Sequence, residues 1–459
     1  MTTRSNGILS KLMTPVGIAP LVTLRILFGA MMVISTVRFL VLGWVKDHYL
    51  DAKCTFKYYG FEWVQVLPEF WMYVLHALML VGALGILFGA FYRLSAWVFF
   101  LTFTYCELID LTYYLNHYYF VSLVAFMMTW VPAGRSFSVD VWRKPSLRLT
   151  SLPRWCIFIF QFQTAIVYTY AGLAKINHDW LIEALPLRIW LPAADKIPVL
   201  GWLFDLPWMP WIFSWIGMLY DCTIVFWLMW RPSRPWAFLT VIVFHVLTGI
   251  LFQIGIFPLV MIAMATVFFS EKWHKRWQLR PWFIPALKKA GRHDEHFYPP
   301  AKPNFKLQTS LALGEIKLLF IFFVFQLLFP WRYVLYPGNL FWTEEGYRFS
   351  WRVMLMEKAG TATFFIKDSK SGREGEVLNS DFLCAHQEKQ MAMQPDMVLQ
   401  FAHFLKKHYA ERGMADPQVR AEVWVTLNGR PSKLLLDPQL DLTKIEDGWK
   451  AKNWIYRHE

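Results

Sequence analysis

The sequence predicts an α-helical polytopic membrane bundle of eight or nine spans, followed by a small extracytoplasmic β-rich α+β domain. Three observations support this fold class. Hydrophobic residues make up 56% of the 459 residues and charged residues 17%, against roughly 45–50% and about 25% in soluble domains. The sequence contains repeated apolar runs whose lengths approach or exceed the roughly 20 helical residues needed to cross a bilayer. After residue 335 charges return and the apolar runs shorten. This composition excludes a soluble globular enzyme, a disordered chain and a fibrous repeat.

Nine apolar runs define the expected spans. They lie at residues 20–42, 71–90, 94–111, 114–133, 154–176, 209–231, 236–255, 256–270 and 311–330. Pro258 follows Gly255 closely and should break a helix, so 236–270 forms either one kinked span or a re-entrant pair. We assign the membrane bundle to residues 1–335 and the extracytoplasmic domain to 336–459.

The basic residues predict the orientation of the bundle. They concentrate in the loops 134–154, 231–234 and 271–310, which the positive-inside rule places in the cytoplasm together with the N-terminus. The net charge of +13 therefore reflects membrane topology, and no nucleic-acid-binding motif accompanies it. The chain has no Asn-x-Ser/Thr sequon, which favours a bacterial inner membrane.

The extracytoplasmic domain shows short strand patterns and one helix. Strands are expected at Phe349–Glu357, Thr361–Ile366 and Glu422–Leu427. Asn428-Gly429 predicts a hairpin turn leading into Lys433–Leu436. Residues 397–409 have the periodicity of a helix.

Ionisable side chains within apolar spans are costly and are therefore functional candidates. Lys175 lies at the outer end of the fifth span, and Gly172 before it makes room for a flat ligand or a neighbouring helix. An amine in an apolar site loses charge stabilisation and becomes available as a base. Alternatively, Lys175 snorkels to the interface, toward Asp179 at i+4.

Two histidines from other spans are further candidates. His117 follows Asn116 at the outer start of the fourth span, and His245 lies inside the seventh. Each histidine alone is also compatible with a structural hydrogen bond to a neighbour. We expect Asp221 to pair with Arg25 and hold the bundle together. The sequence contains no metal-ligand spacing, nucleotide-binding loop or nucleophilic triad.

Five segments together resemble the vitamin K-dependent gamma-glutamyl carboxylases and their bacterial relatives, the horizontally transferred transmembrane domain (HTTM) family. They occur in the family's order over nearly the whole chain, and we identify the chain as resembling a bacterial homologue. The segments are Ala171–Trp180, Asp110 with Asn116-His117, Phe244-His245 with Gln253–Pro258, Trp342–Trp351, and Val423–Val425 with Leu436–Pro438.

The resemblance implies an enzyme that oxygenates a reduced quinone to its epoxide and uses the resulting strong base to deprotonate and carboxylate glutamate. It implies that Lys175 is the base toward the quinol, that His117 and Asn116 orient a quinol oxygen, and that His245 lines the site. Residues expected to line the quinone or glutamate pocket are Tyr168, Trp342, Tyr347 and Trp351.

The implied cofactor is reduced vitamin K or a menaquinol-type hydroquinone, with O2 and CO2 as co-substrates and no metal. The implied partners are this lipophilic quinol, membrane lipids, and a secreted or periplasmic protein substrate that carries glutamate. Nucleic acid is not among them.

Three alternatives remain open from the residues. Family members often carry a histidine shortly after the last span, and here Tyr333 stands at that place. This substitution leaves room for a quinol epoxidase without carboxylation. A non-catalytic quinone- or lipid-binding membrane protein is a second alternative. A transporter is weakened by the absence of paired inverted halves.

Overall fold

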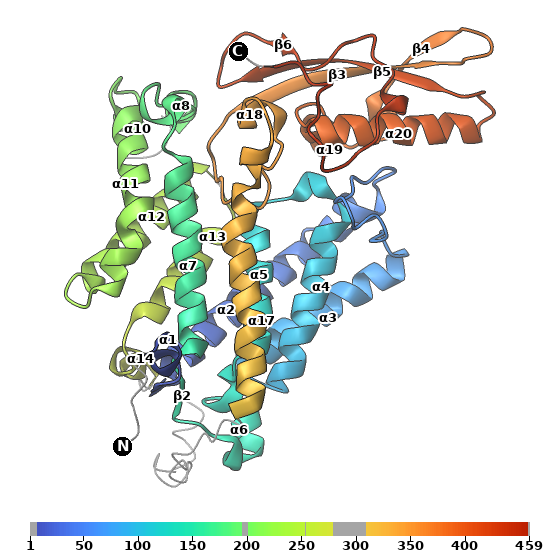
Figure 1. Cartoon of the computed structure of the whole chain (residues 1–459). Helices are drawn as coiled ribbons and strands as arrows, with labels where there is room; N and C mark the ends of the chain where they lie inside the picture. Colours follow the sequence, from blue (N-terminus) through green and yellow to red (C-terminus); the bar gives the residue numbers. More distant parts are fainter. Residues whose placement is uncertain (1–6, 195–200, 253, 279–308, 458–459) are drawn as a thin grey trace.

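The computed structural model describes residues 7–194, 201–252, 254–278 and 309–457, which form a helical bundle with a smaller domain at one end (Figure 1). The bundle consists of α2 (Ala19–Val41), α3 (Glu69–Phe88), α4 (Tyr92–Ile109), α5 (Asn116–Trp130), α7 (Trp155–Ala174), α11 (Met209–Met229), α12 (Arg234–Phe252), α13 (Phe257–Ala265) and α17 (Thr309–Leu328). Each helix overlaps one of the nine apolar runs of the sequence.

Six segments are long and apolar enough to cross a membrane within the described ranges. They are α2, α3, α7, α11, α12 and the segment Ile316–Leu335, which begins within α17. Of the other three, α5 has 15 residues and α13 has 9. The helix composition therefore supports a multi-pass membrane protein with about six candidate spans, and the count of eight or nine remains a prediction.

The segment around Pro258 forms two helices and not one kinked span. Gly255 between them has φ +62, a left-handed conformation that suits glycine. Pro258 is the second residue of α13, where the missing N–H leaves no helical bond unmade. A Cβ on Gly249 of α12 would lie 3.2 Å from Pro258 Cγ, so the two helices pack closely next to their turn.

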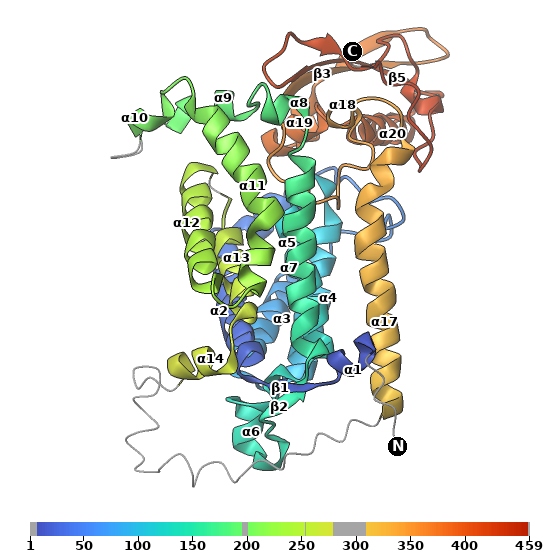
Figure 2. The same cartoon turned by 60° about the vertical axis from the view of Figure 1, so that its left-hand side comes forward.

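The short elements separate into two groups at opposite ends of the bundle (Figure 2). Opposite the smaller domain lie α1 (Ile8–Leu12), α6 (Val139–Arg143), α14 (Glu271–Gln278) and the antiparallel pair β1 (Pro15–Gly17) and β2 (Ser151–Pro153). At the other end lie α8 (His178–Leu181), α9 (Leu187–Trp190) and α10 (Gly201–Phe204). The described parts of the basic loops therefore share one end, as the charge pattern predicts; residues 279–308 lie outside the described residues.

The smaller domain, which we call the outer domain, is a four-stranded antiparallel sheet packed on helices. The strand order is β4-β3-β5-β6, with β3 (Lys358–Lys367), β4 (Glu374–Val377), β5 (Gln418–Leu427) and β6 (Lys433–Leu434). Helices α19 (Ala385–Met391) and α20 (Pro395–Glu411) lie on one side of the sheet (Figure 1). The strands at 361–366 and 422–427, the hairpin and the helix at 397–409 are confirmed.

The strand expected at Phe349–Glu357 is wrong. Between α18 (Leu340–Thr343) and β3 the chain is irregular, and Phe349, Trp351 and Met354 all have positive φ. Trp351 is 1% exposed and belongs to the bundle core. The apolar residues of this segment are thus explained by insertion between the bundle and the outer domain and not by pairing in a sheet.

The expected pair of Arg25 and Asp221 is also wrong. Arg25 is fully buried and donates to the carbonyl oxygens of Ile86 (2.9 Å), Leu87 (2.8 Å) and Phe137 (2.6 Å). Carbonyls in the last turn of a helix lack intrahelical donors, so the guanidinium satisfies the end of α3. Asp221 has a different partner.

Candidate functional site

The partner of Asp221 is Lys175, the residue that directly follows α7. Lys175 Nζ donates to Asp221 Oδ2 at 2.7 Å and to the carbonyl oxygen of Ala171 at 3.3 Å. The two charged side chains are only 9% and 7% exposed. Lys175 therefore does not reach Asp179, and its amine lies inside the bundle against α11.

Close packing of α7 on α11 brings this pair together. A Cβ on Gly172 would lie 2.7 Å from the backbone nitrogen of Cys222, so only glycine permits this approach. Further out, Trp180 of α8 donates through Nε1 to the carbonyl oxygen of Ser214 at 2.9 Å. Helix α11 thus extends beyond the end of α7, and Asp221, in its middle, lies level with the end of α7.

A second polar group links α7, α11 and α12. Tyr168 Oη lies 2.8 Å from His245 Nε2 and 3.3 Å from Tyr220 Oη, and all three side chains are buried. Tyr220 precedes Asp221, so α11 carries a member of each polar group on adjacent residues. The structure therefore brings the predicted residues Tyr168 and His245 into direct contact.

Phe257 links His117 to this group. The His117 ring centroid is 4.1 Å from that of Phe257, and the Phe257 centroid is 6.3 Å from that of His245. The His117 side chain is buried, and its Nε2 has no hydrogen-bond partner among the described residues. A buried polar atom left without a partner is uncommon in proteins, and a ligand atom would satisfy it.

Asn116 and Trp351 fix the surroundings of His117. Asn116 Nδ2 donates to the carbonyl oxygen of Arg352 at 3.0 Å, and Asn116 Oδ1 accepts from Tyr114 Oη at 2.9 Å. The Trp351 ring stacks on Tyr119 with centroids 5.0 Å apart. Both predicted residues therefore join the start of α5 to the irregular segment that precedes the outer domain.

Tyr347 and Trp342 lie further from the bundle core. Trp342 is 1% exposed in the core of the outer domain, where its Nε1 donates to the carbonyl oxygen of Tyr456. Tyr347 lines a cavity of about 290 Å³ between the end of α4 and the outer domain. The charged residues around this cavity are Glu344, Arg348, Glu357, Lys358 and Lys389.

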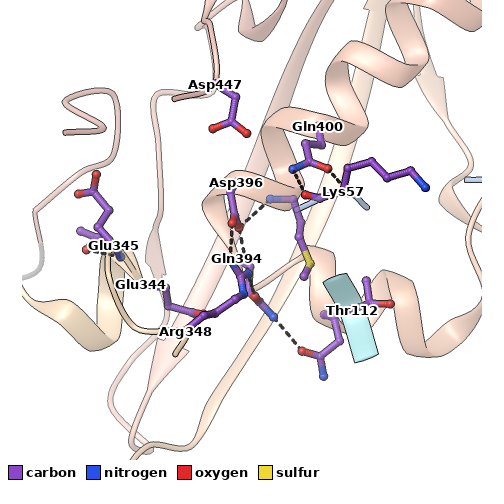
Figure 3. A network of polar contacts seen from close by, with 12 residues as sticks. Lys57, Thr112, Glu344, Glu345, Arg348, Gln394, Asp396, Gln400 and Asp447 are labelled. Atoms are coloured by element: carbon purple, nitrogen blue, oxygen red, sulfur yellow. Dashed lines mark hydrogen bonds and ion pairs between the residues drawn. The ribbon is translucent and has the colours of Figure 1, made fainter. Parts of the chain in front are cut away.

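Two of these charged residues, Glu344 and Arg348, belong to the polar network drawn in Figure 3. Arg348 Nη1 contacts Asp396 Oδ2 at 2.5 Å, and Lys358 contacts Glu344 at 2.8 Å. Burial raises the pKa of Asp396, but the Arg348 guanidinium outweighs it and holds that pKa below its usual range. Lys389 has no ion-pair partner among the described residues, so one cationic group remains available at the cavity.

Two members of this site differ from what the sequence predicts. Asp221 was recognised as an intramembrane acid but given the wrong partner. Tyr220 carried no signal beyond its neighbour Asp221, because a tyrosine in an apolar helix is ordinarily a packing residue.

The fold and the site together define a class of protein. A membrane bundle holds a buried amine–carboxylate pair, a tyrosine–histidine pair and a partnerless imidazole nitrogen among aromatic rings. This combination suits proton transfer with an apolar substrate that enters from the membrane.

Comparison with known families agrees with this class. The HTTM domain model matches residues 13–273, which is more than half of the chain. The model of the vitamin K-dependent gamma-carboxylase lumenal domain matches residues 314–459. The chain therefore belongs to the vitamin K-dependent gamma-carboxylase family, and the residues matched by the lumenal-domain model include its whole outer domain. No solved structure matches the chain.

Proposed function

We propose that this protein is an integral-membrane quinol oxygenase and gamma-glutamyl carboxylase, with Lys175 as the base that acts on the quinol. The single observation that carries the proposal is the buried Lys175–Asp221 pair at 2.7 Å. A reduced vitamin K or menaquinol-type hydroquinone supplies, when bound, the acidic hydroxyl and the ring chemistry with O2 that generates a base strong enough to deprotonate glutamate.

The residues present fit such a group. The hydroquinone ring is flat and apolar, and its hydroxyl needs a base on one side and a hydrogen-bond partner on another. Lys175 would accept the proton, and the Asp221 carboxylate would stabilise the ammonium that forms. His117 Nε2, which has no partner among the described residues, would bind a quinol oxygen. A preorganised group of this kind contributes about 3–4 kcal/mol in a dry site.

The remaining predicted residues shape and seal the site. Tyr168 and His245 hold each other in fixed orientations through their 2.8 Å contact. Asn116 and Trp351 hold the irregular segment over the start of α5, which would exclude water. Exclusion of water preserves a strong base once it forms.

The cavity beside Tyr347 is the proposed entry for glutamate. Lys389 would attract the side-chain carboxylate, because Arg348 and Lys358 are already paired with acids. Trp342 would support this cavity from the outer-domain core. The protein substrate would then approach from outside the membrane, and the quinol from within it.

The experiment incubates purified protein with reduced vitamin K or menaquinol, O2, labelled bicarbonate and a glutamate-containing peptide. Mass spectrometry follows both the quinone and the peptide. Epoxide together with a carboxylated peptide supports the full proposal. Epoxide alone supports the epoxidase alternative, for which Tyr333 at the family's histidine position is the motivating observation. Absence of both products overturns the enzymatic proposal and favours quinone or lipid binding.

A further inference from the structure

A hairpin of the outer domain is hydrogen bonded to α8, the short helix that follows Lys175. Asp179 lies in α8, four residues after Lys175. Its Oδ2 accepts from Arg430 Nη1 at 2.8 Å and its Oδ1 from Arg430 Nη2 at 2.7 Å. Asn428 Nδ2 donates a third hydrogen bond to Asp179 Oδ2 at 2.6 Å. Residues about 250 positions apart in sequence therefore form one bidentate, three-bond contact.

The hairpin itself is held rigidly. Asn428 and Gly429 both have positive φ, as the tight turn between β5 and β6 requires. Asn428 Oδ1 accepts from the backbone nitrogen of Glu357 at 2.9 Å, and the Asn428 backbone nitrogen donates to the Glu357 carbonyl oxygen at 2.7 Å. Glu357 in turn accepts from Trp190 Nε1 at 2.6 Å. The hairpin tip is thus anchored to Glu357, which in turn contacts the end of α9.

Trp180 links the contact between Asp179 and Arg430 to the amine of Lys175. Trp180 follows Asp179 directly, and the Lys175 Nζ atom lies 5.4 Å from the centroid of the Trp180 ring. Trp180 is hydrogen bonded to Ser214 of α11 in both directions, through Nε1 and through its carbonyl oxygen. A shift of Asp179 would therefore move the ring that packs against the amine, and with it the approach of Lys175 to Asp221.

The chemistry of the contact suits a rigid clamp. The planar guanidinium of arginine matches a carboxylate in two parallel hydrogen bonds and fixes its orientation. Hydrogen bonding from Arg430 holds the pKa of Asp179 below its usual range, against the opposing effect of burial. The contact is therefore charged throughout the neutral pH range.

We propose that Arg430 and Asp179 are positioning residues for Lys175, through which the outer domain fixes the geometry of the base inside the membrane. This inference rests on the proposed function, because it assigns a consequence to the position of Lys175. Arg430 itself touches neither substrate nor the amine.

The test measures steady-state quinol oxidation by the full-length protein carrying Arg430→Gln. We expect kcat to fall about tenfold or more, since misplacement of a catalytic group by about 1 Å costs up to about 10²-fold. KM for the quinol should change less than about twofold, because the variant leaves the proposed quinol contacts in place. The control is Arg420→Gln, which removes another half-buried arginine–carboxylate pair of the outer domain, between Arg420 of β5 and Glu374 of β4.

Two further readouts separate positioning from simple stabilisation. In Arg430→Gln the pH profile of kcat should shift, because the Lys175–Asp221 geometry changes. Loss of folded protein would lower the amplitude of the profile without shifting it. The charge-exchanged double variant Asp179→Arg with Arg430→Asp restores an ion pair in the opposite sense and should recover most of kcat and the original profile.

The outcomes distinguish the two proposals. An active wild type with an unchanged kcat and pH profile in Arg430→Gln overturns the positioning role and leaves the proposed function standing. The same holds if Arg420→Gln lowers kcat as strongly as Arg430→Gln. A wild type that consumes no quinol overturns the proposed function, and the positioning role with it.

Discussion

At the scale of single residues, the pairing of Lys175 with Asp221 makes a charged group tolerable inside the bundle. The pair has no net charge whether the proton lies on the amine or on the carboxyl group. Its burial therefore costs less than that of an isolated ion, and removal of one partner would leave an uncompensated charge. Loss of that shared proton leaves a neutral amine beside an ionised carboxylate. When Lys175 then takes a proton from the quinol, the pair returns to zero net charge, so the structural and the proposed catalytic roles of Asp221 coincide.

Asp221→Asn tests this shared role. The amide keeps the size of the side chain but cannot compensate the ammonium that forms on Lys175. Quinol turnover should fall by about 10²-fold or more, within the usual contribution of acid–base catalysis. Asp221→Glu, which keeps the charge, should retain more turnover than the amide variant. Equal turnover in wild type and Asp221→Asn, measured as oxygen uptake, would contradict the role.

Asp179 provides a prediction for stability against pH. Its pKa is lowered in the folded protein by Arg430, so the contact stabilises the fold fully above the ordinary carboxyl value of about 3.9. This stability is lost as pH falls through the lowered pKa. The difference in thermal midpoint between wild type and Asp179→Asn should therefore be constant near neutral pH and shrink below about pH 4. A difference that shrinks between pH 8 and 6 would point to another group.

The residues predicted from sequence were those whose type alone was unusual. Lysine and histidine are conspicuous in an apolar helix, so Lys175, His117 and His245 were identified without a structure. Their hydrogen-bond partners could not be identified in this way, because sequence positions within two helices do not show how far one helix is shifted along the other. Lys175 follows the last turn of α7 and Asp221 lies mid-helix in α11, and only the extension of α11 beyond α7 aligns them. The catalytic roles of all predicted site residues remain predictions.

At the scale of elements, the approach of α7 to α11 determines whether the pair can form. Gly172 allows it, because any larger residue would collide with the backbone of α11. Small residues serve this purpose widely in membrane bundles. The glycine was noticed in the sequence as room for a ligand or a helix, and the structure shows a helix.

Gly172→Ala should therefore separate Lys175 from Asp221. We expect turnover to fall by about 10²-fold, in line with a misplacement of about 1 Å. The control is Gly217→Ala on α11, where the added Cβ would meet only Trp180 Cζ2 at 3.9 Å, an ordinary contact. Oxygen uptake by both variants is the measurement. Full activity in Gly172→Ala, or equal loss in Gly217→Ala, would contradict this account.

The success of element prediction depended on how local the signal was. The turn at Asn428-Gly429 was predictable because its two residues favour positive φ by themselves. The segment Phe349–Glu357 was not, because its apolar residues are inserted between the bundle and the outer domain. Trp351 packs on Tyr119 of α5 and Asn116 holds the Arg352 carbonyl, and such contacts override a strand pattern.

At the scale of the whole molecule, charge and hydropathy predicted the arrangement best. The described basic loops lie at one end and the outer domain at the other (Figure 2), and the model of a lumenal carboxylase domain matches the residues of that outer domain. Charge and hydropathy are summed over many residues, so one residue that departs from the pattern does not change the predicted arrangement. The number of spans was less predictable, because α5 and α13 are shorter than a bilayer-crossing helix.

Cys384 allows the orientation to be tested. It is exposed on the outer domain, whereas Cys54, Cys106 and Cys156 are buried. A membrane-impermeant maleimide should label wild type in intact cells, and Cys384→Ser should remove most of the label. In the Cys384→Ser background, Ser146→Cys at the opposite end should react only after the membrane is permeabilised. The reverse labelling pattern would show that the outer domain faces the cytoplasm, which contradicts the predicted orientation.

The central claim is that Lys175 is the base of a quinol-consuming reaction. Its most direct test is the rate of epoxide formation from the reduced quinone by purified Lys175→Ala. Lys46→Ala serves as the control, since it removes an exposed lysine paired with Asp51. We predict a loss of about 10²-fold or more in Lys175→Ala and wild-type rates in Lys46→Ala, with both variants folded. Epoxide formation by Lys175→Ala at the wild-type rate would contradict the claim.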